Sequence, residues 1–190
     1  MDYTQLSLRE VGAELGIIAR DVDAAFGTLD ARQLNWKPDT TRWSVGQCFE
    51  HLFTANRLMF DAAVAALDPS RTRTIWQRLP VVPGLLGRMM VRSQAPGGRR
   101  KFSAPPAARP AESDVAADIV DRFVDQQRGG ANAVSTLRDR DAVRTIMVSP
   151  FVRVITYSVL DGWRLIVAHD HRHIEQARRV MSAPGFPTRR

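Results

Sequence analysis

The sequence predicts an all-α protein, a four-helix bundle with a long crossover between the second and third helices. The main observation is that apolar residues recur at spacings of three and four, the period of an amphipathic helix, in four stretches: residues 5–30, 44–68, 113–138 and 156–181. The crossover, residues 69–111, contains seven of the chain's 11 prolines and has no sustained period. Because 190 residues with 44% hydrophobic positions suit one core, we expect a single domain over residues 1–190.

The first two helices are predicted from an apolar stripe and from a helix-start signal. The stripe of the first helix consists of Leu8, Val11, Leu15, Ile18, Val22, Phe26 and Leu29. The second helix is expected to begin at Ser44, because Gln47 follows three residues later and the two form a capping box. Asp68 and Pro69 end it.

The second half of the chain is expected to hold a short helix within the crossover, at Leu85 to Val91, and then the last two helices. The third helix contains Gly129 and Gly130, which together cost about 2 kcal/mol relative to alanine in a helix interior. One expectation is therefore that this helix breaks at the two glycines. The fourth helix ends before Ser182-Ala183-Pro184-Gly185, a clear stop signal.

The positive charge is concentrated in one segment. The formal net charge is +7, yet no acidic residue lies between Asp68 and Glu112, where nine lysines and arginines occur. The rest of the chain holds 18 basic and 20 acidic residues and is nearly neutral. A cationic crossover of this kind serves nucleic acid, an anionic small molecule, or solubility alone.

Cysteine content and hydropathy predict a cytoplasmic protein with no membrane partner. The single cysteine, Cys48, cannot form an internal disulfide. The first residues lack the basic and apolar pattern of a signal peptide. No apolar stretch approaches the roughly 20 residues that span a bilayer.

The four histidines carry the strongest chemical signal. His169 and His173 are four residues apart and share one helix face with apolar residues, a spacing that suits two ligands of one metal ion. His171 falls on the opposite, solvent-facing side. The remaining histidine, His51, lies in the apolar second helix and is the candidate third ligand. The alternative is that these histidines bond only to the backbone or to one another.

Two blocks of sequence resemble the DinB-like (YfiT-like) superfamily. Residues 43–52, WSVGQCFEHL, are similar to its W-S-x-x-[EQ]-x-x-x-H-L block, and residues 168–177, AHDHRHIEQA, are similar to its H-x-x-x-H-x-x-Q block. Lys101 to Pro105 and Ser149 to Phe151 also resemble connections of that family. The blocks occur in the family's order at the two ends of the chain.

The resemblance implies a four-helix bundle, often a homodimer, with three histidines that bind a divalent metal, usually nickel or zinc. Carried over, the ligands are His51, His169 and His173, and His171 matches no ligand position. Several such proteins transfer a low-molecular-weight thiol, bacillithiol or mycothiol, to an electrophile, and others are named metal-dependent hydrolases. We therefore expect a metal-dependent thiol S-transferase with a small electrophile and a thiol as partners; a metal-dependent hydrolase is the alternative.

Two alternative functions belong to other classes of protein. One is a nucleic-acid-binding bundle, which the basic crossover and the family's DNA-damage-related name favour. Against it, the crossover contains few aromatic residues, Trp76 and Phe102, and has no recognised nucleic-acid-binding motif. The other alternative is a structural bundle whose histidines bind no metal and have no catalytic role.

Other residues around the predicted centre receive narrower roles. Arg99 and Arg100 are candidates for binding the carboxylates of a thiol cofactor, and Glu50 is a candidate general base. Gln176 and Asp170 are candidates for orienting the ligand rings. Cys48 and Trp43 are interpreted as packing residues of the second helix.

Overall fold

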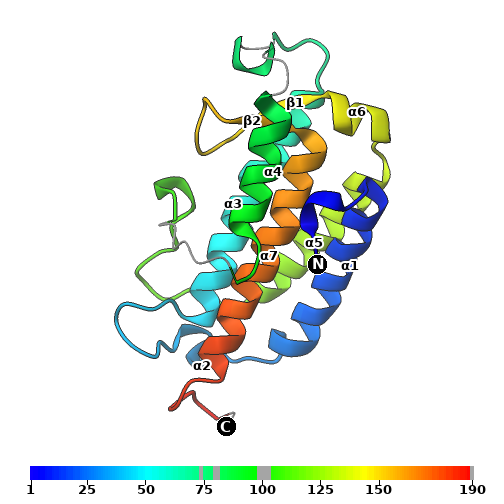
Figure 1. Cartoon of the computed structure of the whole chain (residues 1–190). Helices are drawn as coiled ribbons and strands as arrows, with labels where there is room; N and C mark the ends of the chain where they lie inside the picture. Colours follow the sequence, from blue (N-terminus) through cyan, green and yellow to red (C-terminus); the bar gives the residue numbers. More distant parts are fainter. Residues whose placement is uncertain (73–74, 79–81, 98–103, 189–190) are drawn as a thin grey trace.

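Four long helices form the bundle that the sequence predicts. The computed structural model describes residues 1–72, 75–78, 82–97 and 104–188. Its long helices are α1 (Leu8–Phe26), α3 (Val45–Leu67), α5 (Ile119–Ser135) and α7 (Val159–Met181). Helix α1 packs on α5, α5 on α3, α3 on α7, and α7 on α1, which closes the ring around one core (Figure 1). The all-α bundle is therefore confirmed.

Side-chain caps set where the helices begin. Ser44 and Gln47 form the predicted capping box, so α3 begins at Val45. Ser7 forms a second box with Glu10, and α1 begins only at Leu8, later than the predicted residue 5. The first helix also stops before residue 30, and the short α2 (Ala31–Asn35) follows with its own Asp30 cap. Each box satisfies backbone amides that have no partner inside the helix.

The crossover holds a longer helix than the sequence predicts. Helix α4 (Val82–Gln94) lies outside the four-helix ring, along α7 and against the β-hairpin (Figure 1). Pro83 occupies its first turn, where a missing amide hydrogen costs nothing. The close approach to α7 requires Gly87, because a Cβ there would lie 2.5 Å from Asp161 Oδ2. Single 3₁₀ turns occur at Tyr3–Gln5, Ile75–Arg78 and Pro106–Ala108.

Helix α5 is shorter than predicted and is unbroken. Residues 113–118 are not helical; Val115 instead exchanges backbone hydrogen bonds with the Asn35 side chain, at 2.8 and 3.1 Å. The helix continues through Gly129 and Gly130, so the expected break does not occur. A Cβ at Gly130 would lie 3.0 Å from Phe60 Cζ, whereas Gly129 has open space around it. Gly130 therefore serves close packing between α5 and α3.

A two-stranded hairpin precedes the last helix, where the sequence predicted helix from residue 156. Strands β1 (Ile146–Val148) and β2 (Thr156–Ser158) pair antiparallel, with Met147 opposite Tyr157. Ser158 then caps α7, which begins at Val159. Helix α6 (Asp139–Arg144) connects α5 to the hairpin. Three-residue strands are too short to show a period in sequence, and this explains the error.

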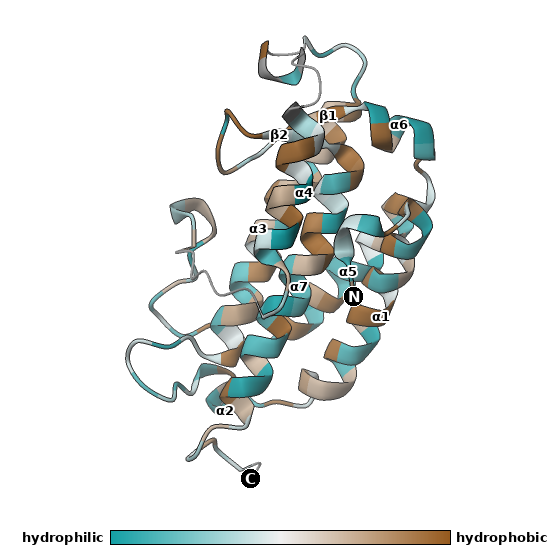
Figure 2. Ribbon diagram, viewed as in Figure 1, coloured by the Kyte–Doolittle hydropathy of each residue, from teal (hydrophilic) through white to brown (hydrophobic). Residues whose placement is uncertain are grey.

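Hydrophobic residues from the four long helices form one buried core cluster, and hydrophobic and polar residues alternate along the helix ribbons (Figure 2). The largest fully buried side chains include Phe26, Phe49 and Phe123, from α1, α3 and α5. Among the described residues, no helix combines the length and the apolar character that a membrane span requires.

Candidate metal centre

Three histidines from two helices meet at one point. His51 projects from α3, and His169 and His173 project from successive turns of α7. One ring nitrogen from each lies within 4.8 Å of the other two, and the Nε2 atoms of His51 and His169 are 3.2 Å apart. The three ring centroids are 4.6, 4.7 and 5.0 Å apart. The structure therefore brings together the three ligands predicted from the sequence.

Hydrogen bonds orient two of the rings. His51 Nδ1 lies 2.6 Å from the carbonyl oxygen of Ala108, and His173 Nδ1 lies 3.0 Å from Gln176 Oε1. Both partners are acceptors, so each Nδ1 carries the proton and each Nε2 keeps its lone pair. A second partner of this type fixes the orientation of metal-binding histidines. Gln176 thus has the ring-orienting position expected of it.

All three imidazoles are held in the neutral form. Burial lowers the pKa of His51, and it lowers that of His169 further, with the neighbouring His173 and His51 adding to the effect. Burial, together with His51 and Arg172, lowers the pKa of His173 to about 3. Because metals bind the deprotonated imidazole, the site is ready to bind at neutral pH without first losing protons.

This donor set fits a divalent transition-metal ion. Two nitrogens that bind one tetrahedral ion at about 2.05 Å lie about 3.3 Å apart, close to the 3.2 Å between His51 and His169. Imidazole donors suit zinc, nickel, copper and iron. A set of three protein ligands leaves a coordination position for another molecule, as in catalytic rather than structural sites.

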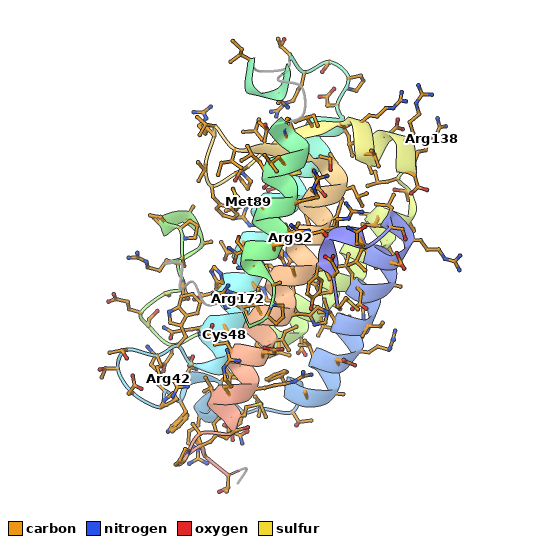
Figure 3. The ribbon with its side chains drawn as sticks, in the orientation of Figure 1. Arg42, Cys48, Met89, Arg92, Arg138 and Arg172 are labelled. Carbon is orange, nitrogen blue, oxygen red and sulfur yellow. The ribbon has the colours of Figure 1, made fainter. Side chains whose placement is uncertain are left out.

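The histidines line a large cavity. Its volume is about 1230 Å³, and its walls come from α3, α4, α7, the hairpin and residues 104–109. Figure 3 shows Met89 on α4, Arg172 on α7 and Arg42 before α3 along one side of the bundle, and all three line this cavity. Ligand sites typically have about 300–1,000 Å³, so the space accommodates more than an ion and a water molecule.

Part of the crossover is attached directly to the centre. Ala108 accepts the bond from His51, and the backbone of Ala111 is bound at both ends by α3. Glu50 accepts from the Ala111 amide at 2.7 Å, and Gln47 donates to the Ala111 carbonyl at 2.7 Å. The carboxylate proposed as a general base thus holds the segment that orients His51.

Trp43 lies at the centre rather than serving only as packing for the start of α3. Its ring is stacked on His173, with centroids 5.8 Å apart and planes inclined by 24°. It also contacts the ring of His51, with centroids 5.0 Å apart. The indole therefore covers two of the three candidate ligands and lines the cavity.

Two other polar residues of α7, His171 and Asp170, do not contribute to the histidine cluster. His171 lies 3.1 Å from Glu14 Oε2 and packs on Tyr3, so it is half-buried against α1 rather than in solvent as expected. Asp170 is fully buried, accepts a hydrogen bond from Asn56 at 2.9 Å, and has its pKa raised well above the usual range by burial. Asp170 thus lies in the core, and its described hydrogen-bond partners do not include a ligand ring.

Cys48 is a packing residue. Its side chain is fully buried, and burial raises the pKa of the thiol to about 12. A thiol in this state is neither a nucleophile nor a ready metal ligand.

Arg99 and Arg100, the candidates for binding carboxylates, lie outside the described residues, as do Lys101 to Ser103. The described part of the chain offers other arginines at the cavity, among them Arg42 and Arg109, whose side chains are exposed. Sequence reasoning did not find the Ala108 carbonyl, because a backbone acceptor leaves no side-chain signal. It also did not find Asn56, the partner of the buried Asp170.

Fold and site together define a helical bundle with an open three-histidine centre beside a ligand-sized cavity. A family model agrees: residues 15–177 match the DinB superfamily. The chain belongs to the DinB superfamily. Searches of curated proteins and of solved structures find no match.

Proposed function

We propose that the protein is a divalent-metal-dependent enzyme that transfers a low-molecular-weight thiol to an electrophilic substrate. The observation that carries the proposal is the group of three neutral imidazoles at the wall of a cavity of about 1230 Å³. A purely structural metal site is closed by four protein ligands and needs no such space.

The chain's own residues would hold and surround the metal. His51, His169 and His173 supply the ligand nitrogens, and Ala108 and Gln176 keep two of the rings in the binding tautomer. A bound divalent ion supplies Lewis acidity, which lowers the pKa of a thiol or water that it contacts. Trp43 covers the rings and limits the approach of bulk water from its side.

The charge at the cavity supports an anionic thiol as one reactant. Among the described residues that line the cavity, four are arginines and one, Glu175, is acidic. Arg179 pairs with Glu175 at 3.6 Å, whereas Arg42 and Arg109 extend from loops as exposed side chains. Guanidinium groups bind carboxylates in a two-pronged geometry, so the carboxylates of a bacillithiol- or mycothiol-type cofactor find suitable partners here.

The first test is elemental analysis of untagged, purified protein. We expect about one equivalent of nickel or zinc, lost in His51→Ala and retained in His171→Ala, a matched histidine that binds Glu14 instead. Protein that stays free of metal after reloading with either ion would overturn the proposal.

The second test is turnover of an electrophile, such as monochlorobimane, with and without added bacillithiol or mycothiol. We expect conjugate formation that requires both the thiol and the metal. Turnover of an ester that needs the metal and no thiol would replace this proposal by hydrolysis, the alternative reaction of the same centre.

A further inference from the structure

The cavity beside the histidines has two chemically different ends. On α7, the lining residues that follow His169 include Arg172, Glu175 and Arg179, whereas those that precede it are Leu165 and Ile166. On α3, the lining residues that follow His51 are Ala55, Asn56 and Met59, and none of them is charged. The histidines therefore lie at a border between a charged region and an apolar region.

The apolar region is a chamber that extends from the histidines toward the hairpin. We define this apolar chamber by six lining residues: Ala55, Met59, Met89, Met90, Phe151 and Leu165. Its far wall is Tyr157, whose hydroxyl lies 3.5 Å from Met59 Sδ. Met59 follows His51 by eight helical residues, so the stretch of α3 beside the chamber rises by about 12 Å.

The polar groups around the chamber already have partners. Asn56 donates to Asp170 at 2.9 Å, and Ser93 Oγ donates to the carbonyl of Met90 at 2.7 Å. Ser149 Oγ accepts from the amides of Phe151 and Val152. A ligand in the chamber would thus meet apolar surface and few free donors or acceptors.

The residues that cover the chamber suit a variable ligand. Three of the chain's six methionines line it, and Met89 is 53% exposed on α4. Methionine side chains are flexible and polarizable, so they adapt to ligands of different shape. The roof consists of α4 and the connection between the strands, not of the rigid four-helix ring.

We infer that the apolar chamber binds the non-reacting part of the electrophilic substrate, an alkyl or aryl group about 10–12 Å long, with the reactive carbon at the histidine border. This inference rests on the proposed function and adds the substrate class. The charged end then takes the thiol, and the apolar end takes the electrophile. Met59, Met89 and Leu165 become residues that determine substrate specificity.

The test is a chain-length series of n-alkyl hydroxamic acids, from acetohydroxamic to octanohydroxamic acid, titrated calorimetrically into metal-loaded protein. The hydroxamate group binds the metal, and the dependence of affinity on the length of the alkyl chain measures binding in the apolar chamber. Each added methylene should tighten binding by about fourfold if it is fully buried. We expect at least about a hundredfold between the shortest and longest members.

Two exposed residues on one face of α4 give a matched pair of variants. Met89→Asp places a charge at the chamber, and Leu85→Asp places the same charge one turn earlier, at a residue that is 61% exposed and outside the cavity lining. We expect the gain per methylene to fall in Met89→Asp and to stay unchanged in Leu85→Asp. Equal effects of the two substitutions would overturn the inference.

A third variant, Ala55→Phe, narrows the passage between the histidines and the chamber. Octanohydroxamate should then bind no better than acetohydroxamate, whose own affinity should be unchanged.

The series also separates this inference from the proposed function. One outcome is tight acetohydroxamate binding that His51→Ala abolishes, with no dependence of affinity on chain length. This result would refute the binding role of the chamber and support the metal centre. A full chain-length dependence with affinities that His51→Ala does not change would support the chamber and overturn the metal-dependent function.

Discussion

Two groups on α7, the half-buried His173 and the buried Asp170, should give the metal-free protein opposing dependences of stability on pH. Burial, with His51 and Arg172, lowers the pKa of His173 to about 3, whereas a histidine in the unfolded chain titrates near 6.5. As the pH falls below 6.5, this histidine binds a proton in the unfolded state but not in the folded state, so the free energy of unfolding falls. Between pH 7 and pH 5 this single group should cost about 2 kcal/mol of the free energy of unfolding.

Asp170 acts in the opposite direction. Burial raises its pKa well above the usual range, so the folded state keeps a proton that the unfolded state loses as the pH rises through about 4. Its contribution to stability therefore falls with rising pH in the same window. A wild-type profile alone does not isolate His173, because Asp170 opposes it and the lowered pKa values of His51 and His169 act in the same direction as that of His173. The exposed carboxylates with lowered pKa, such as Asp39, titrate below this window.

The perturbation that isolates the histidine is His173→Leu. Urea unfolding, followed by tryptophan fluorescence in the presence of a chelator, gives the free energy of unfolding at pH 7 and at pH 5. The change between the two pH values should differ by about 2 kcal/mol between wild type and His173→Leu, with the wild type losing more on acidification. In Asp170→Asn the difference should have the opposite sign. Equal changes in wild type and His173→Leu would refute the assignment of His173 as an imidazole that stays neutral in the folded state.

Three further predictions concern α5, the buried thiol and the hydrogen bond that orients His173. Gly129→Ala should raise the free energy of unfolding by about 1 kcal/mol through helix propensity, because its Cβ meets open space. Gly130→Ala should gain nothing or lose stability, since its Cβ would lie 3.0 Å from Phe60 Cζ; an equal gain at both glycines in urea unfolding would contradict this account. Cys48, with a pKa of about 12, should resist iodoacetamide in the native state at pH 8 and react fully in guanidinium, as mass spectrometry can show; rapid native labelling would disprove its burial. Gln176→Leu should weaken zinc binding by about 10–100-fold in a competition titration with a chromophoric chelator, whereas unchanged affinity would show that His173 needs no such partner.

Much of the fold could be predicted because it depends on patterns local to each helix. The apolar stripe of α1 and the capping box at Ser44 each lie within a few turns of chain. The box is found as predicted, and the stripe is found from Leu8 to Phe26, with only Leu29 outside the helix. The errors lie where long-range packing decides the conformation. Residues 113–118 leave the helix because Asn35, far away in sequence, binds Val115. Gly130 lies inside the unbroken α5, where the approach of Phe60 from α3 leaves little room for a Cβ.

The sequence predicted which three histidines form the candidate centre, but it predicted only some of the residues that surround them. Spacing on one helix placed His169 and His173 together, and the choice of His51 followed because it was the remaining histidine in an apolar helix. The position of Trp43 over the rings depends on how the loop before α3 folds back, which spacing along the chain does not encode. The cavity depends on α4 and the hairpin, whose positions follow from tertiary contacts.

The bond between His51 and the Ala108 carbonyl has a consequence for how this centre can change during evolution or design. Every amino acid provides a backbone carbonyl, so the side chain at position 108 is free to vary on this account, while the path of the chain through that position is not. The length of this segment is therefore constrained, whereas its amino-acid sequence is not. Side chains of α3 hold the Ala111 backbone at its amide and its carbonyl, but an insertion between Pro106 and Ala111 would still displace the Ala108 acceptor. Grafting a different crossover onto this bundle should preserve the metal centre when this spacing is kept, whatever residues fill it.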